Sequence, residues 1–102
     1  MSIRKQFLKG KSVCKVTFKI SEEVSRGVKQ AHVVGEFNNW STTATPMKRQ
    51  KNGSFSTTVE LEVGRSYQFR YLLGQSHWGN DADADDTVLT HFKDSYNSVI
   101  NL

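Results

Sequence analysis

The side chains with the clearest chemical potential in this chain are two tryptophans, Trp40 and Trp78. The flat indole ring can stack on the apolar face of a sugar, while amide and guanidinium groups beside it bond the hydroxyls. Such a combination suits a neutral polyol. The alternative is that one or both indoles belong to the core, as large aromatic side chains usually do. The polar residues near the two tryptophans are Asn38, Asn39, Arg70, Gln75 and Asn80.

The sequence offers no set of residues that would catalyse a reaction. It has no serine, histidine and aspartate at the spacing of a catalytic triad, and no glycine-rich loop that opens a helix to hold a phosphate. Hydrolysis of a glycosidic bond would need two carboxylates held across a cleft. The glutamates are instead typical of solvated loops or strand faces. We therefore expect that the protein is not an enzyme.

A metal site is not expected either. The aspartate-rich run 81–86 resembles the start of a calcium loop, but Asp86 stands where an EF-hand needs glycine. Phe92 stands where the same loop needs a bidentate glutamate. The histidines are too far apart in sequence to suggest a shared ligand set, and a surface or packing role is expected for each: His32, His77 and His91. The sequence thus predicts no metal and no cofactor.

Length and composition describe one soluble domain. The chain has 102 residues, of which 36% are hydrophobic and 24% charged, as in ordinary folded domains. No apolar run is long enough to cross a bilayer, and residues 1–9 lack the apolar stretch and cleavage site of a secretory signal. The single cysteine, Cys14, excludes a disulfide framework and is interpreted as a core residue. These features predict a cytoplasmic protein.

The charge balance does not identify a charged partner. The formal net charge is +4, which raises the question of nucleic acid. The lysines, however, are dispersed along the chain with no run of five or more. We therefore expect neither nucleic acid nor a membrane as a partner.

Period-two alternation of apolar and polar residues predicts a series of short strands. The alternation is cleanest over residues 12–20, and the proline-containing piece 46–49 is expected at a sheet edge. Short strands separated by turn signals, without a helix of useful length, are typical of an all-β, antiparallel β-sandwich. The predicted strands lie at residues 12–20, 29–36, 46–49, 55–62, 67–73 and 96–102.

The segments between these strands carry weaker signals. Residues 1–11 are expected to form an N-terminal arm or a short helical turn, ahead of one domain at 12–102. Residues 21–27 fit either a turn of helix or a loop. Asn52-Gly53 predicts a type I′ hairpin turn, because both residues accept a positive φ. Residues 74–94 have no regular period and are predicted to be a long functional loop.

Several motifs, in order and at consistent spacing, give the chain a resemblance to a known family. It resembles the glycogen-binding domain, family 48 of the carbohydrate-binding modules, from about residue 12 to the C-terminus. That family includes the N-terminal early set domain of isoamylases and branching enzymes and the glycogen-binding domain of the AMP-activated kinase β subunit. The motifs are Val34-Gly35-Glu36-Phe37-Asn38-Asn39-Trp40, Thr45-Pro46-Met47, Gly53-Ser54-Phe55, Tyr67-Gln68-Phe69-Arg70-Tyr71, Trp78, Asn80-Asp81 through Asp85, and Asn97-Ser98-Val99-Ile100.

The resemblance implies an immunoglobulin-like β-sandwich of the early set type that binds α-1,4-glucan such as glycogen, starch or maltooligosaccharides. Carried onto matching positions, it implies that Trp40 and Trp78 stack on glucose units and that Arg70 and Asn97 bond hydroxyls. Arg70 stands where the kinase branch often has lysine, which has a different donor geometry. Asn39, beside Trp40, is an additional candidate.

Some positions depart from the family pattern. The turn 73–77 is longer than the family's usual one, which leaves open whether Trp78 joins the platform. Ala82 replaces a proline, which loosens its loop, and Leu89 and His91 differ from a common Val-Pro-Asn segment, so no ligand contact is assigned there. The alternative function is an interaction domain that docks an amylolytic enzyme or a kinase in trans without binding sugar itself.

Overall fold

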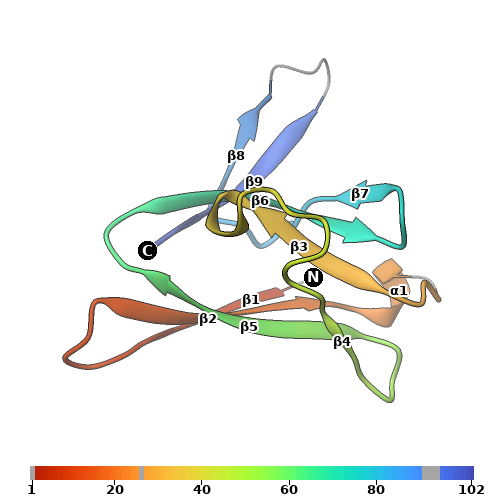
Figure 1. Ribbon diagram of the computed structural model, residues 1–102, viewed down its shortest axis with the longest axis horizontal. Coiled ribbons are helices and arrows are strands. Elements are labelled where there is room, and N and C mark those ends of the chain that lie inside the picture. The colour runs from red at the N-terminus through yellow and green to blue at the C-terminus, as the bar shows by residue number, and fades with distance from the viewer. Residues whose placement is uncertain (1, 26, 91–94) are drawn as a thin grey trace.

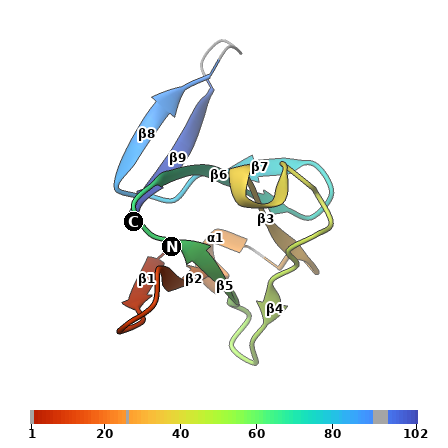
Figure 2. The ribbon, with the colours of Figure 1, turned by 60° about the vertical axis from the view of Figure 1, so that its left-hand side comes forward.

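The chain folds into two antiparallel β-sheets that face each other as layers (Figures 1 and 2). The computed structural model describes residues 2–25, 27–90 and 95–102. The first sheet has the strand order β1-β2-β5-β4, and the second has the order β3-β6-β9-β8, with β7 also paired to β6. The predicted all-β sandwich is confirmed. The strands are β1 Ser2–Phe7, β2 Val13–Ile20, β3 Ala31–Gly35, β4 Lys48–Arg49, β5 Phe55–Glu62, β6 Ser66–Leu73, β7 His77–Gly79, β8 Asp86–Leu89 and β9 Tyr96–Asn101.

The alternating residues of β2 supply one wall of the core, as the sequence predicts. They are fully buried because the opposite sheet covers that face of β2: Cys14, Val16, Phe18 and Ile20. The ring of Phe18 packs edge-on against Phe69 of β6, with ring centroids 5.0 Å apart. Removing such large apolar side chains from water contributes on the order of 2 kcal/mol each.

Strand β6 lies at the centre of the second sheet and is bonded along both edges. Strand β3 pairs with residues 69–73 of β6 on one edge. On the other edge, β9 pairs with residues 66–69 and β7 with residues 71–73. Arg70 therefore lies where β6 passes from β9 to β7. This arrangement fixes which outward side chains become neighbours.

The two inward tyrosines of β6, Tyr67 and Tyr71, each donate a hydrogen bond from the hydroxyl group. The Tyr67 hydroxyl donates to the carbonyl oxygen of Glu62 at 3.0 Å, so the ring closes the corner between β5 and β6. The Tyr71 hydroxyl donates to Oδ2 of Asp81 at 2.6 Å, and both residues are buried. Burial, reinforced by this hydrogen bond and the nearby negative charge, raises the pKa of Tyr71 far above its ordinary value of 10.0.

Replacing Tyr71 with phenylalanine should reveal this bond in both stability and pH dependence. At neutral pH the variant leaves a buried carboxylate oxygen without its donor, which should cost about 2 kcal/mol of unfolding free energy. The raised pKa means that the tyrosine's contribution is complete below the unfolded value of 10.0 and is lost as pH rises above it. Urea denaturation should therefore show a gap between the two proteins at neutral pH that narrows in alkaline buffer. Tyr96→Phe, at a side chain that is 49% exposed, is the control; a gap unchanged by pH would contradict the prediction.

The first residues are part of the sandwich, which differs from the expected arm or helical turn. Residues Ser2–Phe7 form β1, which pairs antiparallel with β2 from Ser2 opposite Lys19 to Phe7 opposite Cys14. Ile3 packs against the core. The sequence does not mark this segment as a strand, because Lys5 interrupts the apolar positions Ile3 and Phe7; pairing with β2 satisfies the backbone along one edge of β1.

Local hydrogen bonds define the structure of two short connections. Residues Glu22–Ser25 form a single helical turn, α1, whose start is capped by the Ser21 hydroxyl accepting from the Val24 amide at 3.3 Å. The hairpin between β4 and β5 is not a type I′ turn. Among the described non-glycine residues only two have a positive φ, and Asn52 is not one of them, whereas Gly53 has φ 87°.

The Gly53 amide donates to the carbonyl of Gln50 at 3.0 Å, and only Gly53 takes the left-handed conformation. A turn followed by a left-handed glycine suits a longer hairpin loop.

The stretch 74–94 is more regular than its sequence predicts. It contains β7 and β8, so the prediction of a long irregular loop is wrong over its described part. Strand β7 has only three residues, and every residue of β8 is exposed, so neither displays an alternating pattern. No helix in the described part of the chain is long and apolar enough to cross a membrane.

Candidate functional site

The loop that carries Trp40 leaves the second sheet through a tight, bonded turn. Strand β3 ends at Gly35 and is followed by one 3₁₀ turn, Glu36–Asn38. Asn39 and Trp40 then adopt left-handed backbone angles, with φ of 57° and 58°, and the Trp40 amide donates to the Gly35 carbonyl at 2.8 Å. A bulky residue rarely adopts this conformation unless its surroundings impose it. The turn thus holds the indole out from the sheet.

Asn38 fixes this turn by three hydrogen bonds from one side chain. Its Oδ1 accepts from the Gly35 amide at 3.1 Å, and its Nδ2 donates to the Val33 carbonyl and the Thr45 hydroxyl, both at 2.9 Å. These bonds tie the loop to the end of β3 and to the segment that leads to β4. The first asparagine of the pair therefore has a structural role.

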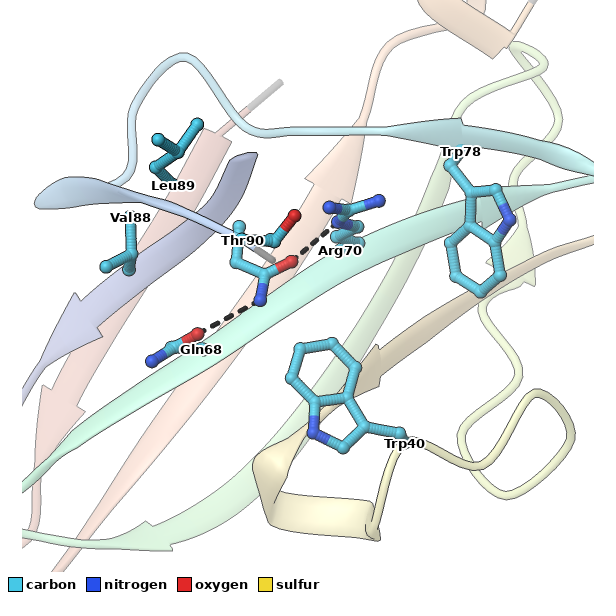
Figure 3. A pocket seen from close by; sticks show the side chains of 8 residues that line it. Trp40, Gln68, Arg70, Trp78, Val88, Leu89 and Thr90 are labelled. Carbon is cyan, nitrogen blue, oxygen red and sulfur yellow. Dashed lines mark hydrogen bonds between the residues drawn. The ribbon is translucent and has the colours of Figure 1, made fainter. Parts of the chain in front are cut away.

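Trp78 reaches the same region from a different element. It lies in β7 directly opposite Leu72 of β6, and its side chain is 44% exposed, close to the 40% of Trp40. Both indoles line one hollow on the outer face of the second sheet, where Figure 3 shows them directed toward the same space. The longer turn before Trp78 therefore does not remove it from the neighbourhood of Trp40. Neither indole is a core residue.

A chain of hydrogen bonds crosses the floor of the hollow. Arg70 donates from Nε to Oδ1 of Asn97 at 2.6 Å, and Asn97 donates from Nδ2 to Oε1 of Gln68 at 3.0 Å. Arg70 also donates from Nη2 to the Ser95 hydroxyl. These bonds fix the guanidinium plane and orient both amides before any ligand arrives. The network joins β6 to β9.

The hollow has an apolar wall facing the tryptophans. Its volume is about 430 Å³. In Figure 3 the indoles lie at one end, Val88 and Leu89 of β8 at the other, and Arg70 between them. The lining residues are Trp40, Gln68, Arg70, Trp78, Val88, Leu89, Thr90 and Asn97.

The composition of this lining limits its chemistry. Among the residues that line it, Arg70 is the one charged side chain, and the others are aromatic, aliphatic, amide or hydroxyl groups. Such a surface can stack on a ring and exchange hydrogen bonds with hydroxyl groups. In the described part of the chain, no group of three potential ligands from histidine, cysteine, aspartate and glutamate is placed to hold a metal ion.

The aspartate-rich loop has a structural role at its first residue. Asp81 accepts from the Tyr71 hydroxyl and, through Oδ1, from the Asp83 amide at 2.8 Å. Its own amide donates to the Ser98 hydroxyl at 3.0 Å. These contacts tie the start of the loop to β6 and β9. Phe92 and His91, which entered the sequence arguments on metal sites, lie outside the described residues.

Comparison with known proteins now identifies the family. Residues 18–102 match the family profile described as the glycogen recognition site of AMP-activated protein kinase. The chain belongs to this family. No curated protein matches the chain. The family binds carbohydrate, and the sequence resemblance to a glycogen-binding domain is confirmed.

The match to the glycogen recognition family includes the whole hollow and excludes β1. It begins within β2 and covers every residue that lines the hollow. The four main residues named from the sequence meet there: Trp40, Arg70, Trp78 and Asn97. Asn39 does not line the hollow; its left-handed backbone helps to place Trp40 instead.

Sequence reasoning missed the rest of the lining. The sequence does not assign Gln68 to a ligand site, because its bond to Asn97 depends on how β9 pairs with β6. Val88 and Leu89 were missed because β8 is exposed on every residue and has no alternation. The signal that could have found them is a pair of large aliphatic residues in an otherwise polar stretch.

Proposed function

We propose that this chain is a non-catalytic module that binds α-1,4-glucan on the platform formed by Trp40 and Trp78. The observation that carries the proposal is the convergence of two half-exposed indoles from separate elements on one hollow with oriented hydrogen-bonding groups. Membership in the glycogen recognition family supports a glucose polymer as the ligand.

Each group has a distinct role in this proposal. The indoles cover the apolar faces of successive glucose rings, and the amides of Gln68 and Asn97 exchange hydrogen bonds with hydroxyls. Arg70 commits Nε and one Nη2 hydrogen to its neighbours, which leaves its Nη1 donors for the ligand. Val88 and Leu89 contact the ring edges from the other side. Because these bonds pre-order the floor, little side-chain entropy is lost on binding.

Binding of maltoheptaose at two salt concentrations tests this function. Saturable quenching or shift of tryptophan fluorescence is expected, with a dissociation constant nearly independent of salt because the ligand is neutral. Binding of an anionic polymer through the positive charges of the chain would instead weaken steeply as salt rises. Cellohexaose, a β-linked glucan, is the matched control ligand. Tryptophan fluorescence that does not change when maltoheptaose is added would contradict the proposal.

An interaction domain is the second candidate. The family is named for a kinase, and two large apolar residues of the paired strands β8 and β9 are well exposed: Leu89 at 64% and Tyr96 at 49%. A domain of this kind would dock a kinase or an amylolytic enzyme in trans. In that case maltoheptaose would leave both the indole fluorescence and the amide NMR shifts unchanged, while glucan binding would move the shifts around Trp40, Trp78 and Asn97.

A further inference from the structure

Strands β8 and β9 form a paired unit that extends away from the sandwich (Figure 1), and Val88 and Leu89 of β8 line the hollow. Figure 1 shows the two strands projecting from the rest of the second sheet. Strand β8 lies at the sheet edge and is bonded only to β9 among the described strands. All four of its residues are exposed, so packing does little to hold it. Val88 and Leu89 therefore belong to a strand whose position depends on its few bonds.

The β9 side of this unit is held by side chains of β6. Arg70 bonds Asn97 and Ser95, and the Ser66 hydroxyl donates to Oδ1 of Asn101 at 2.6 Å. Each of these bonds connects β9 or the residue before it to β6. None of them contacts β8, which carries the apolar wall.

The start of β8 is held both by β9 and by the opposite sheet. Asp85 immediately precedes β8, and its amide donates to the Val99 carbonyl at 2.9 Å. Oδ2 of Asp85 accepts from the Asn101 amide at 2.7 Å and from Nζ of Lys5 at 2.5 Å. Lys5 also donates to the Asn101 carbonyl at 3.1 Å. Lys5 thus joins β1 of the first sheet to the base of both β8 and β9.

The strand that supplies this lysine lies outside the matched family region, which begins at residue 18. Lys5 shares the inward-facing side of β1 with Ile3, which packs on the core, so its side chain is directed toward the second sheet. The side chains of Lys5 and Asp85 are 26% and 33% exposed, so water only partly screens their pair. Among the described residues, the other ion pair joins Glu62, the last residue of β5, to Arg65 in the turn that follows.

We infer that Lys5 is a positioning residue for the glucan site: through Asp85 it holds β8 at the angle that brings Val88 and Leu89 to the hollow. The inference rests on the proposed function for its effect on binding, but its effect on β8 does not. Strand β1 thereby influences the affinity for the ligand without contacting it. Loss of the contact frees β8 while leaving the tryptophan platform in place.

Two measurements on Lys5→Met test the inference. In the free protein, amide hydrogen exchange of residues 86–89 should accelerate about fivefold, the size expected for losing a partly exposed ion pair, while exchange in β2 and β5 stays unchanged. The dissociation constant for maltoheptaose should rise by a similar factor of about five. Lys5→Arg should restore both values, and the double variant Lys5→Met/Asp85→Asn should add little to the single one.

The matched control is Arg4→Met, on the adjacent outward-facing position of β1, which should change neither measurement. Unchanged exchange in β8 of Lys5→Met would overturn the inference whether or not the protein binds glucan. Uniformly faster exchange throughout both sheets would also overturn it, because Lys5 would then act on global stability. If the parent protein does not bind maltoheptaose but hydrogen exchange in β8 accelerates in Lys5→Met, the proposed function is wrong and the positioning role of Lys5 is supported.

Discussion

Trp40→Ala is expected to weaken binding of maltoheptaose about 30-fold, which corresponds to roughly 2 kcal/mol for a central aromatic contact. The indole presents a flat apolar surface at the end of a turn fixed by Asn38. Alanine removes the whole surface but leaves the hydrogen bonds of Arg70 and Asn97 intact. The ligand would keep its hydroxyl contacts and lose its stacking partner.

Isothermal titration with maltoheptaose and retardation on a gel containing soluble starch both measure this loss. Phe7→Ala is the matched control because Phe7 is also an exposed aromatic residue, at 57%, and does not line the hollow. Thermal unfolding should place the Trp40 variant near the parent, since the ring is not part of the core. The starch gel should retard the parent protein strongly. If it retards the Trp40 variant equally strongly, the platform assignment is wrong.

Gly35→Ala is expected to have the largest effect on stability, about 3 kcal/mol, as overpacking in a close-packed core does. A Cβ at this position would lie 2.6 Å from the carbonyl oxygen of Gln68 and 2.8 Å from Cβ of Phe69. The backbone of Gly35 is extended, with φ −166°, so the conflict comes from space and not from conformation. Relief would require β3 to move away from β6.

Thermal unfolding measures this cost, and the midpoint should fall by on the order of 10 to 20 °C for a domain of this size. Gly79→Ala is the matched control: it lies in the same sheet, and its added Cβ would meet only Cδ1 of Leu73, at 3.9 Å. An equal midpoint for the two variants would contradict the close approach of β3 and β6. Because Trp40 follows Gly35 by one turn, the Gly35 variant should also bind maltoheptaose more weakly.

The parts of the fold that sequence predicts well are those in which burial alternates. Strand β2 and the inward aromatics of β6 are recognised because one face is packed and the other is not. The same reasoning fails for β8, whose side chains are all exposed, and for β7, which is too short for a period. Alternation reports contact with a core, and these two strands lack that contact.

The residues of the candidate site likewise fall into those that the sequence predicts and those that it does not. Trp40, Trp78, Arg70 and Asn97 were found because their residue types suit a sugar and their spacing follows a known family. Val88 and Leu89 could not be predicted from their residue types, since they line the hollow only because β8 pairs with β9. The role of residues 2–7 was missed because the contact of Lys5 with Asp85 spans eighty positions of sequence.

Because β6 pairs with β9 and then with β7 along one edge, the floor of the hollow and its rim depend on different partner strands. Trp78 is located by the ladder between β7 and β6, with Leu72 opposite it, and the length of the turn that joins the two strands fixes the register of this ladder. One residue gained or lost between Leu73 and His77 would shift this register and turn the Trp78 indole toward the opposite face, while the bonds among Gln68, Arg70 and Asn97 would stay in place. The turn is therefore a place where the rim of the site can be reshaped, by evolution or by design, without rebuilding its floor.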